Sequence, residues 1–156
     1  MVRFVKLNRE GLTLVEVMIA LLVMLVVFFA LMQTALVGID SNMLNSLRNE
    51  AVNVAEIRMN EVKTKPFASI VSDSNSLSAC VSDCPAGFPA TGVCNPRNVR
   101  SISGFNFCTN LSCGEIGGPD NDCATDDADN RQITIMVGWK WKGQDYRHTI
   151  ATIRKR

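Results

Sequence analysis

Six cysteines are the residues of this sequence that are best suited to covalent chemistry, because all of them lie between positions 80 and 123. They are Cys80, Cys84, Cys94, Cys108, Cys113 and Cys123. An even number of cysteines in a loop-rich region is typical of a disulfide framework made in an oxidising compartment. Six cysteines can pair in many ways, and the sequence leaves the connectivity open.

Zinc binding and redox catalysis are the alternative uses of such a cluster. Zinc sites usually combine closely spaced cysteine pairs with histidine, whereas the single histidine, His148, lies far from the cluster in sequence. The sequence has no C-x-x-C spacing for a thioredoxin-like site and none for haem attachment. We therefore expect structural disulfides, no metal and no cofactor.

Glu16 is the second residue of chemical interest, because it is the only charged residue from Leu12 to Ile39. A carboxylate near the centre of a membrane helix costs about 2.5–3.5 kcal/mol on insertion scales, and such residues usually have a functional partner. An ordinary membrane anchor would be better served by leucine at this position. Glu16 is therefore expected to have a functional partner.

The apolar segment around Glu16 predicts a membrane-spanning helix. The 23 residues from Val17 to Ile39 would form a helix of about 34 Å, close to the ~30 Å hydrocarbon core of a bilayer. Three basic residues precede the segment, and the first basic residue after it is Arg48. The positive-inside rule then places the N-terminus in the cytoplasm and the cysteines outside it. A cleavable secretory signal is less suitable, because its apolar region is shorter and ends at an A-x-A-like site.

Helical periodicity continues beyond the apolar segment, over residues 40–66. Apolar residues recur there mainly at spacings of three and four, at Leu44, Leu47, Ala51, Val54, Ile57 and Val62. This pattern predicts an amphipathic helix half, which ends near Lys65 because Pro66 follows. We expect it to pack on a sheet. A juxtamembrane coiled coil is the alternative, and Asn53 and Asn60 interrupt its heptads.

The residues around Glu16 resemble a known processing signal. The octapeptide from Arg9 to Glu16, REGLTLVE, is similar to the class III signal of type IV pilins and pseudopilins. The resemblance implies that residues 1–11 are a leader, which prepilin peptidase removes after Gly11, and that Leu12 is then N-methylated. It also implies that Glu16 pairs with the terminal amine of a neighbouring subunit. Leu12 departs from the family pattern, in which phenylalanine is usual.

Residues 67–156 are expected to form a globular head with irregular, disulfide-pinned loops up to Asn130 and one strand at Ser101–Phe107. The alternation in QITIMVGWKW predicts a strand from Gln132 to Trp141 with one apolar face. A turn at residues 142–145 and a second strand at residues 146–153 complete a hairpin. The predicted fold is α+β and pilin-like: a long helix from Leu12 to Lys65, packed on a small antiparallel sheet.

The C-terminal hairpin, with its V-x-W strand, also resembles the type IV pilus modification (PilV-like) minor pilins. Five aspartates precede the hairpin, and we expect a solvated acidic loop here rather than a calcium site, since no EF-hand spacing is present: Asp120, Asp122, Asp126, Asp127 and Asp129. Trp139 and Trp141 lie on one face of the strand and are expected to be core residues rather than a ligand platform, and His148 is expected to be an ordinary strand residue. The terminal Arg154-Lys155-Arg156 is expected to be solvated.

Composition and motifs favour a structural role over catalysis. No nucleophile–base pair, phosphate loop or catalytic pair of carboxylates stands out in the sequence. Its net charge of +1 gives no reason to expect nucleic-acid binding. The expected protein is a minor pilin of the inner membrane and then of the pilus, whose partners are other pilin subunits and the prepilin peptidase. A minor pseudopilin of a type II secretion system or a DNA-uptake pseudopilus is the alternative. A membrane-anchored periplasmic redox or metal protein is the alternative from another class.

Overall fold

The computed structural model describes residues 13–116, 123 and 129–156. These residues form a long helix, a 3₁₀ turn and four strands: α1 (Leu14–Thr64), η1 (Phe67–Ser69), β1 (Val93–Val99), β2 (Ile102–Glu115), β3 (Asn130–Trp141) and β4 (Gln144–Lys155). The predicted α+β class, with one long N-terminal helix and an antiparallel sheet, is confirmed. The chain divides into two units, Met1–Asn42 and Met43–Arg156, and α1 contributes residues to both.

Helix α1 runs without interruption for 51 residues. The amide of Lys65 donates to the carbonyl of Val62, and Pro66 stops the helix because it favours an extended conformation in the residue before it. The predicted C-terminal boundary near Lys65 is confirmed. Leu12, the predicted first residue, lies outside the described residues.

The second half of α1 carries a buried stripe inside the unit Met43–Arg156. Its members recur at helical spacing, at Met43, Leu47, Ala51, Val54, Ala55, Met59 and Val62. Two predicted core residues lie at the edges of this stripe: Leu44 is half-buried, and Ile57 is 38% exposed. The buried face is therefore rotated slightly from the predicted one and uses Met43 and Met59, whose flexible side chains fill irregular gaps well.

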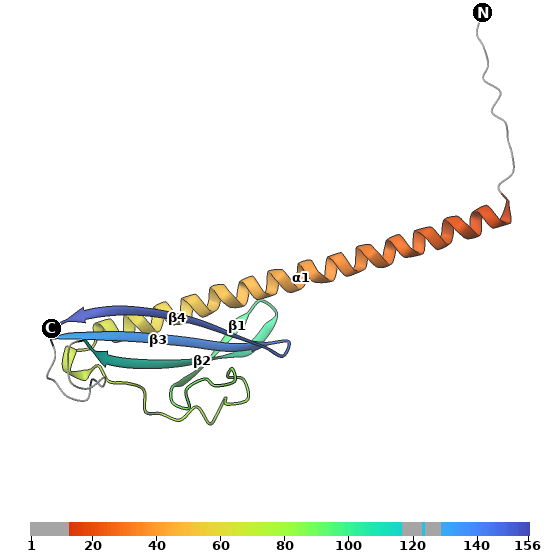
Figure 1. The fold of residues 1–156 in the computed structure, drawn as a ribbon. Coiled ribbons are helices and arrows are strands. Elements are labelled where there is room, and N and C mark those ends of the chain that lie inside the picture. Colours follow the sequence, from red (N-terminus) through yellow and green to blue (C-terminus); the bar gives the residue numbers. More distant parts are fainter. Residues whose placement is uncertain (1–12, 117–122, 124–128) are drawn as a thin grey trace, which may run out of the picture. The chain divides into compact units, whose positions relative to one another are not determined.

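The four strands form one antiparallel sheet in the order β1-β2-β3-β4, so that every strand pairs with its neighbour in sequence (Figure 1). The alternation predicted for β3 is confirmed, since Ile133, Ile135, Val137 and Trp139 are buried with the stripe of α1. Trp141 is half-buried at the edge of the same core. Aromatic rings extend this core across the sheet, with Trp139 stacked on Tyr146 and tilted against Phe107.

Two expectations about the head are corrected. The predicted strand at Ser101–Phe107 is the start of the longer β2, and β1, which was expected to be a loop, pairs with it. The sequence did not predict β1 because it contains Pro96 and two asparagines, which are uncommon in strands. An edge strand tolerates such residues because only one of its sides needs partners. The turn between β3 and β4 is Lys142-Gly143, with φ values of 49° and 75°, shorter than the predicted four residues.

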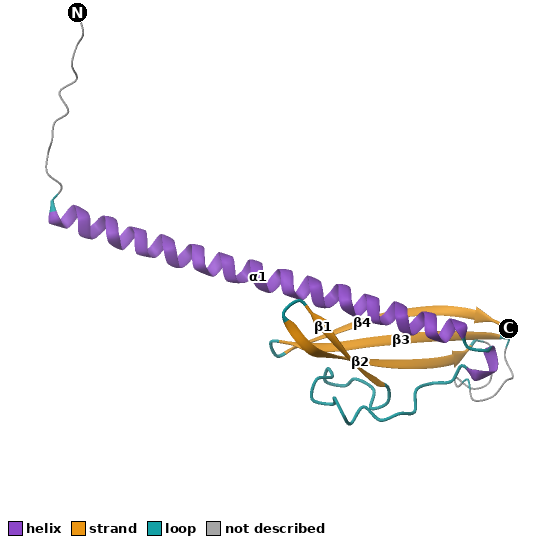
Figure 2. Ribbon diagram, turned by 180° about the vertical axis from the view of Figure 1, so that it is seen from behind, coloured by secondary structure: helices purple, strands orange, loops and turns teal. Residues whose placement is uncertain are grey.

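The second face of the sheet is covered by the segment from residue 71 to residue 92, on the side opposite α1 (Figure 2). Leu77, Cys80, Cys84 and Cys108 form a small separate core there. Gly138 allows the close approach, because a Cβ at this position would lie 2.7 Å from two ring carbons of Phe88. The sheet of the head is therefore sandwiched between a helix and a loop.

Candidate functional site

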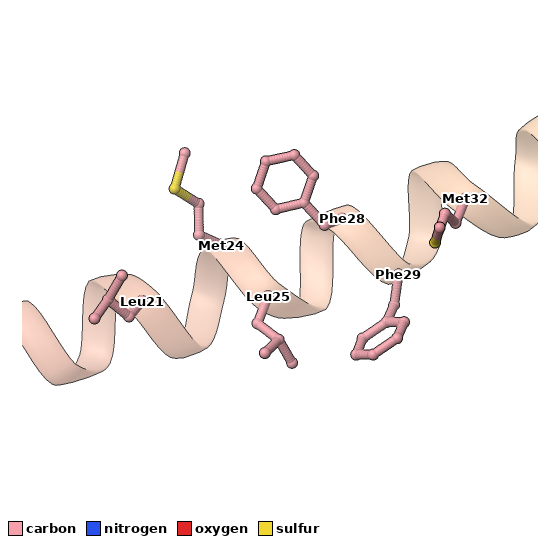
Figure 3. A pocket seen from close by; sticks show the side chains of 6 residues that line it. All are labelled: Leu21, Met24, Leu25, Phe28, Phe29 and Met32. Atoms are coloured by element: carbon pink, nitrogen blue, oxygen red, sulfur yellow. The ribbon is translucent and has the colours of Figure 1, made fainter.

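The first half of α1, in the unit Met1–Asn42, presents an apolar surface to its surroundings. Every large apolar side chain from Leu14 to Ile39 is at least 43% exposed. Figure 3 shows Leu21, Leu25, Phe28 and neighbouring side chains projecting from the helix, where they line a shallow open groove. The helix has the length and composition to cross a membrane. Apolar surface of this extent is costly in water.

Glu16 lies in the first turn of α1 and is exposed. Its amide donates to the Thr13 carbonyl at 3.0 Å and lies 3.3 Å from Thr13 Oγ1, so that Thr13 is the N-cap of the helix. A carboxylate at this position is stabilised by the positive end of the helix dipole. The spacing T-x-x-E is that of a capping box, a signal that the sequence analysis did not use. Glu16 therefore lies at the N-terminus of α1, next to the residue that caps the helix.

Several predicted site residues lie outside the described residues. They include Gly11 and Leu12, the predicted cleavage and methylation positions, and four of the aspartates, Asp120, Asp122, Asp126 and Asp127. Asp129 is described, and its carbonyl accepts from the amide of Arg156 at 2.9 Å. Peptidase cleavage and the solvated nature of the acidic loop therefore remain predictions.

All six cysteines, each of which the structure describes, are paired in disulfides. The pairs are Cys80–Cys94, Cys84–Cys108 and Cys113–Cys123. The predicted disulfide set is confirmed, and the structure supplies the connectivity that the sequence left open. The sulfurs of Cys80, Cys84 and Cys108 lie within 4.8 Å of one another, but a sulfur in a disulfide is not the thiolate that a metal binds.

Two disulfides fasten one face of the sheet to the covering loop, and the third lies on the opposite face. Cys94 and Cys108 are direct cross-strand partners in β1 and β2, and their bonds to Cys80 and Cys84 tie the covering loop to both strands. Cys113 points to the opposite face, where its bond to Cys123 lies within the main core. A head with a small core gains covalent stabilisation on both sides.

Asp73 joins the covering loop to both α1 and β2, a role the sequence analysis missed. One carboxylate oxygen lies 2.8 Å from Arg58 Nη2, and the other accepts from the Leu111 amide at 2.8 Å. The Asp73 amide in turn donates to the Leu111 carbonyl at 2.9 Å. These contacts satisfy the edge of β2 beyond the end of β1. One aspartate in a polar loop carries no sequence signal for this role.

Two arginines were also missed, and one of them corrects an expectation. Arg154, expected to be solvated, is half-buried, and its Nη1 lies 2.7 Å from the carbonyl oxygen of Lys65 and 3.0 Å from that of Lys63. Arg131, only 1% exposed, donates to the carbonyl of Phe67 at 2.6 Å and stacks over its ring. The expectation failed because a terminal basic run looks the same in sequence whether or not a helix end lies beside it.

No protein-family model, no curated protein and no solved structure that was compared with this chain matches it. The class of protein therefore rests on the structure. A long N-terminal helix, apolar and exposed in its first half and packed on a small antiparallel sheet in its second, is compatible with a pilin-like fold. The prediction that the two tryptophans belong to the core is confirmed, since Trp139 is buried in it and Trp141 packs against it.

Proposed function

We propose that this chain is a non-catalytic, pilin-like structural subunit, a minor pilin of a type IV pilus. The observation that carries the proposal is α1 itself, in which an exposed apolar stretch with a single carboxylate continues into a stripe buried under the head. A plain anchor requires the first feature only. A subunit that leaves the membrane for a filament core requires both, since its apolar half must exchange lipid for other helices.

Processing is the first element of the proposal. Prepilin peptidase cuts after Gly11, and Leu12 becomes the methylated N-terminus. The N-terminal side faces the cytoplasm, and the head with its three disulfides faces the oxidising compartment. The basic leader and the disulfide pairing support the same orientation independently.

Assembly through Glu16 is the second element. In the proposed filament the Glu16 carboxylate pairs with the terminal amine of a neighbouring subunit, and each charge offsets the desolvation of the other. The position of Glu16 in the first turn of α1 supports this role, because it places the exposed carboxylate close to the N-terminal end of the helix, where it is free to contact a neighbouring subunit.

The minor-pilin assignment rests on the head. The β3–β4 hairpin carries Val137-Gly138-Trp139, the V-x-W pattern of the PilV-like group. The loop held by two disulfides forms part of the surface of the head. Deletion of the gene separates this proposal from its nearest rival. Loss of pili supports a minor pilin, whereas enzymes trapped in the periplasm would indicate a type II secretion pseudopilin.

The first experiment is to measure the intact mass and the N-terminal sequence of the protein from membranes and from sheared surface filaments. A chain that starts at methylated Leu12 and is present in filaments is the expected result. A chain that still starts at Met1, in cells that process other pilins, would refute the proposed processing and favour a plain anchor.

Substitution of Glu16 tests the assembly role. Glu16→Ala should leave the protein in the inner membrane and reduce its amount in filaments at least tenfold, as judged by immunoblot of sheared pili. Glu56→Ala is the matched control, because Glu56 is also an exposed carboxylate on α1 and lies outside the apolar stretch. Equal incorporation of both variants would contradict the proposed role of Glu16.

A further inference from the structure

The two disulfides of the covering loop meet at one point in the small core. Cys80 and Cys84 are four positions apart in the sequence. They bond to residues that lie directly opposite each other in β1 and β2. As a result, Cys80 Sγ lies 4.0 Å from Cys84 Sγ, to which it is not bonded. Only a small displacement separates this arrangement from one in which those two sulfurs are joined.

The four sulfur-bearing residues differ in how accessible they are. Cys80, Cys84 and Cys108 are 2%, 6% and 0% exposed, whereas Cys94 on the edge strand β1 is half-buried. An incoming nucleophile therefore reaches the Cys80–Cys94 bond at Cys94. Thiol–disulfide exchange depends on which sulfur is attacked, and the other sulfur departs as a thiolate. The thiolate set free in this case belongs to Cys80, inside the cluster.

We propose that these two disulfides form a coupled pair, through which one incoming thiolate, such as that of a thiol–disulfide oxidoreductase, breaks both covalent bonds that join the covering loop to β1 and β2. This inference does not depend on the proposed pilin function. It concerns the attachment of the loop to the sheet, which the disulfide geometry alone defines.

The exchange has two steps that conserve electrons. The incoming thiolate bonds to Cys94 Sγ and breaks the Cys80–Cys94 bond, so that the electron pair leaves on Cys80 Sγ. Cys80 Sγ then attacks Cys84 Sγ at 4.0 Å, forms a Cys80–Cys84 bond and expels Cys108 as a thiolate, which takes a proton. One mixed disulfide and one free thiol result, with no net oxidation or reduction.

The loop then keeps only non-covalent attachments to the sheet. Asp145 accepts from the Ala86 amide at 2.8 Å, Arg147 donates to the Ala86 carbonyl, and Lys140 donates to the Ser82 carbonyl at 3.1 Å. These contacts lie at exposed positions and are individually weak, whereas the contacts of Asp73 still hold the start of the loop to β2 and α1. Cys113–Cys123 is not part of the sulfur cluster and serves as an internal control.

The test treats the intact full-length protein in detergent with reduced glutathione, followed by alkylation and non-reducing tryptic mapping. Trypsin produces one peptide of residues 64–97 and another of residues 101–131, which the Cys84–Cys108 bond joins in the native protein. The expected result is that the two peptides separate, with glutathione on Cys94, a Cys80–Cys84 bond and alkylated Cys108. A glutathione adduct on Cys94 in peptides that remain joined would overturn the proposal, as would the absence of any adduct at Cys94.

A pair of variants tests the second step without an external thiol. Cys94→Ser leaves Cys80 unpaired, and exchange should move the alkylation site from Cys80 to Cys108 in a substantial fraction of molecules. Cys123→Ser is the matched control, in which alkylation should remain on Cys113. Alkylation of Cys94→Ser at Cys80 alone, with Cys84–Cys108 intact, would overturn the coupling.

Discussion

At the scale of single residues, two arginines close the end of the long helix. The last carbonyls of any helix lack partners within it, and Arg154 supplies donors to those of Lys63 and Lys65. Arg131 does the same for Phe67 and Ile70 in the turn that follows. The two side chains are direct cross-strand partners in β3 and β4. Such neighbouring like charges would repel each other, and the carbonyl oxygens at the helix end compensate for this repulsion.

Arg154→Ala should lower the free energy of unfolding of the head by about 1–2 kcal/mol, because it leaves helix-end carbonyls without their charged donor. Thermal or urea unfolding monitored by circular dichroism measures the change. Lys155→Ala is the control, since Lys155 is the next residue of β4 and is exposed. Equal stability of the two variants would show that the cap contributes nothing.

Asp73 is the second residue whose removal should be costly. Asp73→Ala leaves Arg58 without its partner at 2.8 Å and the Leu111 amide without an acceptor, in a place where the Asp73 side chain is only 10% exposed. The expected loss is about 2–4 kcal/mol. Asp83→Ala removes another loop aspartate, which accepts from the side chains of Asn106 and the adjacent Ser82, and it should cost less in the same urea titration. The reverse order would contradict the bridging role of Asp73.

At the scale of elements, the loop that covers the second face depends on one glycine in β3. Phe88 occupies the space that a side chain at Gly138 would need, and Pro85 lies equally close on the same side. The alternating pattern of β3 predicted its apolar face but gave no sign that the other face is also covered. That cover comes from a segment rich in turn residues, whose position is decided by two disulfides and a few polar contacts.

Gly138→Ala should destabilise the head by about 1–3 kcal/mol, because the new methyl group must displace the Phe88 ring or the loop. A double-mutant cycle with Phe88→Ala measures the coupling, and we expect the second substitution to recover part of the loss. The free energies come from urea unfolding under non-reducing conditions. Strictly additive effects would mean that Phe88 does not press on Gly138.

At the scale of the whole molecule, the chain divides into a unit whose apolar side chains are exposed and a unit with its own core. All members of the main core lie between Met43 and Trp139, whereas the apolar side chains before Asp40 are exposed. The division falls within α1 rather than at its end. A single helix can serve both units because its first half is apolar on every side and its second half is amphipathic.

A fragment of residues 43–156 should therefore fold and remain soluble without detergent, with three disulfides and the thermal stability of the head in the full-length protein. Full-length protein should require detergent or lipid. Gel filtration, circular dichroism and thiol titration test both statements. A fragment that aggregates or contains free thiols would show that the residues before Met43 contribute to the fold of the head.

The sequence by itself determined the features that depend on local order. The 51-residue helix followed from the apolar segment, from the periodicity that continues it and from Pro66. The β3–β4 hairpin followed from alternation, and the disulfide set from the clustering of cysteines. Glu16 was found as the one charge in an apolar segment, and Thr13 was overlooked although its spacing was visible. Each of these signals lies within a few residues, because hydrogen bonds within a helix or a hairpin join near neighbours.

Only the tertiary structure decided which distant groups meet. The disulfide connectivity depends on the position of Cys94 opposite Cys108 in two neighbouring strands. The sequence did not predict the first of these strands, because it contains Pro96. The roles of Asp73, Arg131 and Arg154 depend on carbonyls and amides that lie 38 to 91 residues away in sequence. A polar side chain carries the same local signal whether it faces water or the end of a buried helix. Its role is fixed only when packing removes the water and leaves one partner within reach.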